Sequence, residues 1–206
     1  MTASLVSFSL AAALIVLLPG PDTLVVLRNL VRGGRRTATL TVLGVLSGLV
    51  VWVGAAALGL AAVLHASEAA YTVLRIVGAI YLVWIGVQSL RSRGSVPDVE
   101  DALPERRGLL GRGYGAGLAT DLLNPKVGVF FVTFLPGFVP DGRPVGPVSL
   151  LLGAVFVLET AFYFALLLLL AGRITGWLAD SRTRRRMDRL TGLVLVGFGA
   201  RLAAEG

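Results

Sequence analysis

The chain has 206 residues, of which 55% are hydrophobic and only 15% are charged, and its mean hydropathy is +0.82. A soluble domain of this size shows more charge to water, so the composition predicts an integral membrane protein. With no cysteine and a single histidine, the chain has no disulfide, no thiolate nucleophile and little for a metal site, so we expect no metal and no other cofactor. The net charge of +7 does not indicate nucleic-acid binding, because the arginines stand in short runs between apolar segments.

Apolar stretches long enough to cross a bilayer recur along the chain. They predict six transmembrane helices, at about residues 4–31, 37–64, 69–90, 112–136, 145–171 and 188–204. The first eight residues carry no Lys or Arg, so the charged region of a cleavable signal peptide is missing and the first segment is predicted to be a retained span.

The arginines predict the orientation of these spans. Most of them lie in or beside the first, third and fifth connections, around residues 32–36, 91–112 and 173–189. The positive-inside rule therefore predicts a multi-pass protein with these connections in the cytoplasm and both termini outside. Two interpretations of the run from Arg182 to Arg186 remain open, contact with anionic lipid headgroups or a stop signal for the last span.

Two of the spans are interrupted by proline, at Pro-Gly-Pro-Asp-Thr (19–23) and at Asn-Pro-Lys (124–126). In each break a proline can begin a restarted half-helix behind a capping residue, which pairs Pro21 with Gly20 and Pro125 with Asn124. Unwound backbone at membrane depth is tolerated only where protein or a water-filled cavity surrounds it. Both breaks are therefore predicted to line a binding site.

The two halves of the chain resemble each other in pattern. Aligning the breaks puts Asp22 opposite Lys126, and farther along the two halves residues 75–84 match 189–198 in the spacing of Arg, Gly and an aromatic residue. Each half holds three spans, an odd number, so the second half must enter the membrane from the other side. We predict an all-α fold with one transmembrane transport domain over 1–206, built as a 3+3 inverted repeat: repeat one about 4–90, linker 91–111, repeat two about 112–206.

Four ionisable residues fall at membrane depth, where such groups by default mark a substrate or ion route: Asp22, Asp121, Lys126 and Glu159. Structural alternatives remain open for three of them: Asp22 as a helix cap, Lys126 as a counter-ion, and Glu159 as a passive partner of another group. The candidate site is completed by neighbours at the breaks and on the fifth span, namely Gly20, Pro21, Thr23, Asn124, Pro125 and Tyr163.

These groups suit a zwitterion. A half-helix N-terminus and Lys126 favour a carboxylate, while Asp22, Asp121 or Glu159 could hold an ammonium group or a proton. One carboxylate cannot easily hold both at once, which is the physical basis of proton antiport. The residues leave open which carboxylate would do this.

The same stretches resemble a known family. They are Pro19 to Thr23, Arg32 to Arg36, Gly44 to Gly48, Gly78 to Leu82 with Trp84 and Gly86, and Asp121 to Lys126 followed by Phe130 and Phe131. Together they resemble the lysine-exporter (LysE) superfamily, especially its homoserine/threonine-exporter (RhtB) branch. The resemblance implies an exporter of amino acids or related small metabolites in the bacterial cytoplasmic membrane, driven by the proton gradient and working as a homodimer. Glu159 matches no motif of that family.

The sequence thus predicts a secondary transporter rather than an enzyme, with an amino acid, protons and membrane lipid as its partners and no nucleic acid. An intramembrane aspartyl-type enzyme built from a carboxylate pair is an alternative, and so is a channel or a non-transporting membrane scaffold. No Gly-rich ATP-binding loop is present, so primary pumping by this chain is not expected.

Overall fold

The structure, a computed structural model, describes the chain except for residues 67, 92–111, 141, 171–180 and 205–206. The described residues form helices and turns without any β-strand, which confirms the all-α prediction. In chain order the elements are α1 (Thr2–Leu17), α2 (Pro21–Ala66), α3 (Glu68–Arg91), α4 (Gly113–Leu122), α5 (Pro125–Val129), the π-helical turn η1 (Phe130–Phe134), the 3₁₀ turn η2 (Leu135–Phe138), α6 (Val145–Leu169) and α8 (Ser181–Ala204).

The first predicted span is broken where the sequence places the break. α1 ends at Leu17, Leu18 is extended, and the helix resumes at Pro21. The Gly20 carbonyl accepts the first hydrogen bond of the resumed helix, from the backbone N of Leu24 at 3.1 Å. Gly20 therefore stands at the capping position, as predicted.

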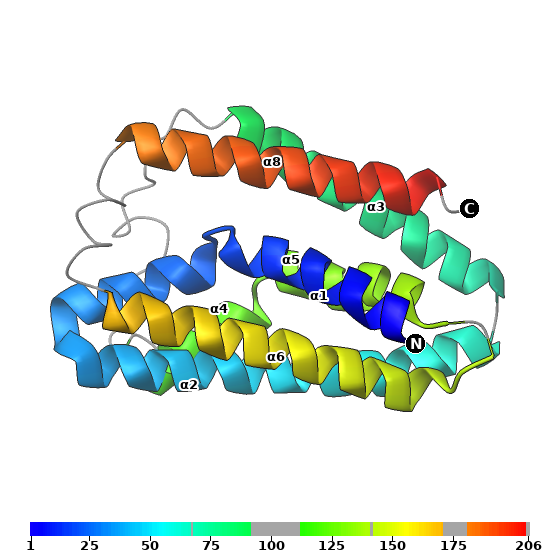
Figure 1. Ribbon diagram of the computed structural model, residues 1–206, viewed down its shortest axis with the longest axis horizontal. Coiled ribbons are helices and arrows are strands. Elements are labelled where there is room, and N and C mark those ends of the chain that lie inside the picture. Colours follow the sequence, from blue (N-terminus) through cyan, green and yellow to red (C-terminus); the bar gives the residue numbers. More distant parts are fainter. Residues whose placement is uncertain (67, 92–111, 141, 171–180, 205–206) are drawn as a thin grey trace.

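α2 consists of two helical arms joined by a sharp turn. At Gly34 the backbone has φ 71° and ψ −176°, a conformation that is essentially restricted to glycine. The chain turns back there, so the arms 21–33 and 35–66 run antiparallel (Figure 1). Across the turn Asn29 Nδ2 donates to Thr41 Oγ1 at 2.8 Å, and both side chains are buried. The predicted connection between the first two spans falls on this turn.

The fourth predicted span is a series of short helical pieces. α4 ends at Leu122, α5 begins at Pro125, and the chain continues through η1 and η2 without an intervening loop. A π-helical turn inserts an extra residue into a helix and is frequent at functional sites. After the second break, the chain therefore forms only the short helix α5 before it departs again from the regular α-helix in η1.

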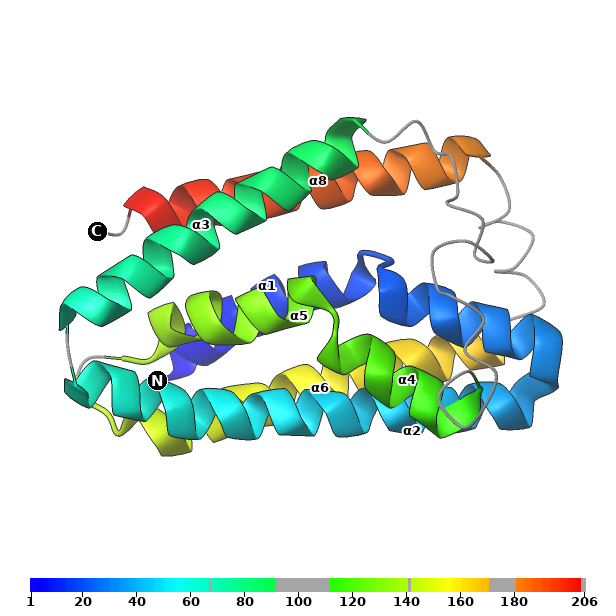
Figure 2. The same cartoon turned by 180° about the vertical axis from the view of Figure 1, so that it is seen from behind.

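The broken helices pack at the centre of the molecule. α2 packs against α4 and α6, whereas α3 packs against α8, and both views show α3 and α8 together along one side (Figures 1 and 2). The backbones of α2 and α4 approach closely at two glycines. A Cβ on Gly44 would meet the carbonyl oxygen of Tyr114, and one on Gly117 would meet that of Thr41. This contact holds α4, and with it the second break, against α2.

A cluster of phenylalanine rings fixes the segment that follows the second break. In η1, the Phe130 ring centroid lies 4.9 Å from that of Phe156 in α6 and 5.8 Å from that of Phe8 in α1. All three rings are buried. Aromatic pairs of this geometry add about 0.5–1.5 kcal/mol each beyond the area they bury. The cluster thus ties α5 and η1 to both α1 and α6.

Among the described residues, two helical stretches are long and apolar enough to cross a bilayer, Pro21–Gly59 and Val145–Leu169. Thr2–Leu17 and Ile76–Arg91 are shorter apolar helices. Each of the six predicted spans falls on one or more helices of the structure, but the two broken spans consist partly of helices too short to cross a bilayer. The number of spans and the inverted repeat therefore stay predictions. Nearly all of the predicted linker 91–111 lies outside the described residues.

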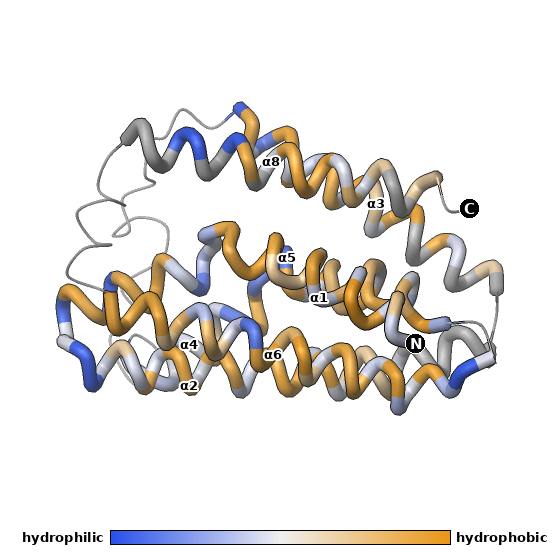
Figure 3. The backbone as a smooth tube through the Cα atoms, viewed as in Figure 1, coloured by the Kyte–Doolittle hydropathy of each residue, from blue (hydrophilic) through white to orange (hydrophobic). Residues whose placement is uncertain are grey.

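The start of α1 and the end of α8 lie toward the same end of the molecule, together with the end of α2 and the start of α3 (Figure 1). The turn within α2, the end of α3 and the starts of α4 and α8 lie toward the opposite end. Hydrophilic residues mark that end on α2 and on α8 (Figure 3), where the sequence places two of its arginine runs. Which end faces the cytoplasm stays a prediction.

Candidate functional site

The two helix breaks meet, as the sequence predicts. Asn124 Nδ2, from the second break, donates a hydrogen bond to Asp22 Oδ2 at 2.6 Å, across 102 positions of sequence. Asp22 is the second residue of α2, and Lys126 is the second residue of α5. The starts of both half-helices therefore face a common space.

Asn124 performs two tasks at once. Its Oδ1 accepts a hydrogen bond from the backbone N of Lys126 at 3.1 Å, which caps α5, and Pro125 needs no acceptor because it has no N–H. Its Nδ2 is then the atom that faces Asp22, so the two partners together fix the orientation of the amide. The side chain is only 1% exposed. The capping role predicted for Asn124 is confirmed.

Lys126 connects the second break to the end of α1. Its Nζ donates to the Leu18 carbonyl at 3.0 Å and to the Ile15 carbonyl at 3.2 Å. These carbonyls belong to the last turn and the C-cap of α1, where backbone acceptors have no helical partner and where a cation is favourable. The ammonium group also acts electrostatically on Asp22 and Asp121, but these two hydrogen bonds go to backbone carbonyls. Two of its three donors are thereby used.

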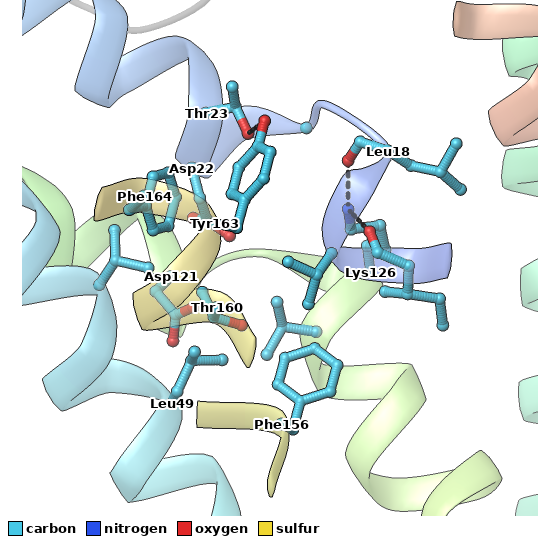
Figure 4. Close-up of a pocket in the computed structure, with 15 residues that line it drawn as sticks. Leu18, Asp22, Thr23, Leu49, Asp121, Lys126, Phe156, Thr160, Tyr163 and Phe164 are labelled. Carbon is cyan, nitrogen blue, oxygen red and sulfur yellow. Dashed lines mark hydrogen bonds between the residues drawn. The ribbon is translucent and has the colours of Figure 1, made fainter. Parts of the chain in front are cut away.

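A cavity of about 30 Å³ lies between the breaks and α6 (Figure 4). Charged and polar side chains from four helices, α2, α4, α5 and α6, line it, together with an apolar wall. Six residues predicted from the sequence line the cavity, namely Gly20, Asp22, Thr23, Asp121, Lys126 and Tyr163. The lining also includes the polar Thr160 and the apolar Leu49, Phe156 and Phe164. The volume is room for one or two water molecules. An amino acid would need the walls to move apart.

Asp121 is the most deeply buried charged residue that the structure describes at this site, with an exposed fraction of 0%. Neither of its carboxyl oxygens has a hydrogen-bond partner among the described residues. Gly48 makes room for the group, because a Cβ there would collide with the carboxyl. The Asp121 backbone carbonyl accepts a hydrogen bond from Trp52 Nε1 at 3.3 Å. An unpaired buried polar group is costly and usually has a functional or structural explanation.

α6 supplies the wall opposite the breaks. The hydroxyl groups of Tyr163 and Thr23 lie 3.3 Å apart, which links α6 to the start of α2 (Figure 4). Glu159 does not line the cavity; Ser9 of α1 hydrogen-bonds to it instead. Thr160, which the sequence analysis did not select, does line the cavity. Residues 159 and 160 both lie about one helical turn before Tyr163, so spacing alone could not choose between them.

The distribution of polarity defines the class of protein. Large apolar side chains of α6 face outward, with Leu158 69% and Phe162 67% exposed, while Asp121 and Asn124 are buried at the centre. A soluble protein shows the opposite arrangement, and exposed apolar surface of this kind indicates contact with a membrane. Broken helices that enclose a polar cavity at membrane depth are characteristic of secondary transporters.

Comparison with known proteins identifies the family. The LysE type translocator family matches residues 13–206. The chain is 32% identical over 199 residues to a threonine efflux protein of Salmonella typhimurium, covering 95% of this chain and 96% of that protein. It is 30% identical over 203 residues to a leucine efflux protein of Salmonella choleraesuis, covering 96% and 93%. It is also 29% identical over 202 residues to the membrane protein YrhP of Bacillus subtilis, covering 95% and 96%. No solved structure matches the chain.

The chain therefore belongs to the LysE type translocator family, which confirms the resemblance drawn from its motifs. This membership places it among bacterial membrane proteins, in a family of transporters rather than enzymes.

Proposed function

We propose that this protein exports a small zwitterionic amino acid across the bacterial cytoplasmic membrane in exchange for protons. The family and the relatives named for threonine and leucine efflux support amino-acid export. The observation that carries the proposal is the hydrogen bond between Asn124 and Asp22, which joins two helix breaks around a cavity that also holds Lys126. A transporter needs such a site, with opposite charges for the two ends of its substrate.

The carboxylate end of the substrate is assigned to Lys126 and the start of α2. Lys126 keeps one donor after its two bonds to the end of α1. The first turn of α2 presents backbone N–H groups and the positive end of the helical arm 21–33, both of which attract a carboxylate. An amino acid bound there would compete with the Leu18 and Ile15 carbonyls for the ammonium group, which couples binding to the position of α1.

Counting charge suggests how protons could drive the process. With Asp22, Asp121 and Lys126 all ionised, the cavity carries a net charge of −1, and a zwitterionic substrate does not change that value. One bound proton neutralises the cluster. Crossing the membrane is costly for an uncompensated charge, so the site without substrate would return through the membrane most readily when a proton is bound. Antiport requires in addition that the bound proton and the substrate exclude each other, because charge alone would equally allow them to cross together. Asp22 is assigned this proton because it lies at the junction of the two breaks.

Alternating access follows from the size of the cavity. At about 30 Å³ it is too small for an amino acid, so binding requires its walls to move apart. We propose that the site opens in turn to each side by movement of the broken helices, as an inverted repeat would allow, with both termini outside the cell. The bond between Tyr163 and Thr23 and the bonds of Lys126 to the end of α1 are the contacts that opening would break.

The test is transport by the purified protein in proteoliposomes. We expect exchange of labelled L-threonine or L-leucine across the membrane, and accumulation of the label when a pH gradient is imposed. Absence of exchange for every amino acid in a panel of neutral, basic and acidic members would overturn the proposal.

Asp22→Asn tests the proton assignment. We expect this variant to retain exchange, in which no net proton movement is needed, and to lose the accumulation driven by a pH gradient. Glu159→Gln is the matched control, because it makes the same carboxyl-to-amide change outside the cavity and is expected to leave both activities intact. Proton-driven accumulation that survives in Asp22→Asn would refute the role of Asp22.

A further inference from the structure

Buried oxygen atoms without hydrogen-bond partners concentrate at the cavity. Among the described residues, such atoms on cavity-lining side chains are Oδ1 of Asp22, both carboxyl oxygens of Asp121, and Oγ1 of Thr160. All of them can accept hydrogen bonds, and only the Thr160 hydroxyl can also donate one when the carboxyls are ionised. This part of the cavity therefore lacks donors.

The buried hydroxyl groups of Thr160 and Ser149 in α6 differ from the helical hydroxyl groups of α2. In α2 the hydroxyls of Thr37, Thr39, Thr41 and Ser47 each donate to the backbone carbonyl four residues earlier, at 2.7–2.9 Å. That local bond is the ordinary way for a buried helical Thr or Ser to satisfy its hydroxyl. The Thr160 hydroxyl makes no such bond although its side chain is only 6% exposed. It remains available to a group inside the cavity.

Asp121 and Thr160 line the cavity from two different helices. Asp121 comes from the end of α4 and Thr160 from the middle of α6, and Figure 4 shows the two side chains next to each other, apart from the Lys126 ammonium. Leu49 and Phe156 line the same space and keep it apolar around them. A charged hydrogen-bond donor placed there would satisfy the two groups at once.

We propose that Asp121 and Thr160 form the subsite that binds the ammonium group of the exported amino acid. The inference rests on the proposed function and adds the orientation of the substrate. A primary ammonium has three N–H donors and one positive charge, which complements one carboxylate and one neutral oxygen. The carboxylate end then lies toward Lys126, and Asp22 between them remains free to carry the proton.

The test compares amino acids with analogues that lack the amino group. Exchange of labelled L-leucine is measured in proteoliposomes that contain either the wild-type protein or Thr160→Val. Unlabelled L-leucine or 4-methylpentanoate is added as the competitor. For Thr160→Val we expect the half-saturating concentration of L-leucine to rise about tenfold, the size expected for losing one hydrogen bond to a charged group. Because 4-methylpentanoate does not use the subsite, its inhibition constant should stay unchanged. If labelled L-leucine is not exchanged, labelled L-threonine with 3-hydroxybutyrate replaces that pair.

Two further variants separate the subsite from a structural role of α6. Thr160→Ser keeps the hydroxyl and should behave as wild type. Ser149→Ala removes the other buried, unpartnered hydroxyl of α6, which lies outside the cavity, and should leave both constants unchanged. If Thr160→Val does not fold, the same comparison is made with Asp121→Asn. The affinity of this variant for the amino acid should fall, and its affinity for the des-amino analogue should stay unchanged.

The outcomes are distinguishable from failure of the proposed function. Suppose that the wild-type protein exchanges amino acids, and that Thr160→Val and Asp121→Asn still favour the amino acid over its des-amino analogue as strongly as the wild type does. That result would overturn the subsite and leave the export proposal standing. An oxygen-lined site could also take Na⁺. Wild-type exchange that requires Na⁺, with the requirement lost in Thr160→Val, would likewise overturn the assignment to the substrate ammonium.

Discussion

Replacing Asn124 by alanine should destabilise the protein strongly, because one buried side chain holds both helix breaks together. The change removes the cap on α5, which is worth about 1 kcal/mol. It also removes the donor to the Asp22 carboxylate, and hydrogen bonds to charged groups are worth about 1.5–3 kcal/mol. The two losses are separate, so we expect a decrease of about 2–4 kcal/mol in the free energy of unfolding.

The two contributions can be separated by exchanging the partners. Asn124→Asp keeps an oxygen that can cap α5, but it loses the donor and sets a second carboxylate against Asp22. The double variant Asp22→Asn with Asn124→Asp restores one amide donor, one carboxylate acceptor and the cap, now with the groups reversed. We expect Asn124→Asp to be as unstable as Asn124→Ala, and the double variant to lie within about 1 kcal/mol of the wild type.

The assay is unfolding in detergent, followed by the fluorescence of the tryptophans. Trp52 is a suitable reporter because its indole donates to the Asp121 carbonyl, beside the second break. The four proteins are compared at one detergent concentration. A loss below about 0.5 kcal/mol in Asn124→Ala, or a double variant no more stable than Asn124→Asp, would show that the contact between the breaks does not contribute as argued.

Two further predictions concern helix packing and the role of Lys126. Gly44→Ala should destabilise the protein by about 1–3 kcal/mol, because the added methyl meets the Tyr114 backbone, which cannot move without separating α2 from α4. Gly54→Ala in the same helix adds its methyl to open space and should be neutral or slightly stabilising in the same unfolding assay; equal losses in the two variants would contradict this interpretation. Lys126→Met, reconstituted in proteoliposomes at the same amount as the wild-type protein, should lose at least about 90% of amino-acid exchange. This loss is expected because removing one charge-assisted hydrogen bond weakens binding about tenfold or more. Undiminished exchange in that variant would exclude Lys126 from substrate binding.

Much of the local structure could be predicted because short stretches of sequence carry it. The prolines and their capping residues set both helix breaks, and Asn124 caps α5 as expected. The connection predicted at residues 32–36 falls on the turn at Gly34, whose backbone angles are essentially restricted to glycine. These features depend on neighbours a few positions away, so residue type and spacing were sufficient.

The selection of site residues was less complete, because side-chain direction depends on packing. Glu159 was selected for its charge, yet it pairs with Ser9, and the uncharged Thr160 beside it lines the cavity. For Lys126 the sequence left substrate binding and a counter-ion role open, and it did not indicate the hydrogen bonds to the end of α1. Periodicity places a residue on a helix face within roughly one turn. It does not tell which neighbouring helix that face meets.

By itself the sequence determined that the protein belongs in a membrane, that two of its helices break at proline, and that charged residues accompany both breaks. These properties follow from hydropathy and from backbone geometry, which act locally. Only the tertiary structure decided that Asn124 meets Asp22, that the Asp121 carboxyl lies against Gly48 with no hydrogen-bond partner in the described part of the chain, and that Thr160 joins the cavity. Those contacts link residues distant in sequence, and they exist because α2, α4 and α6 pack together, with backbones touching where glycine allows it.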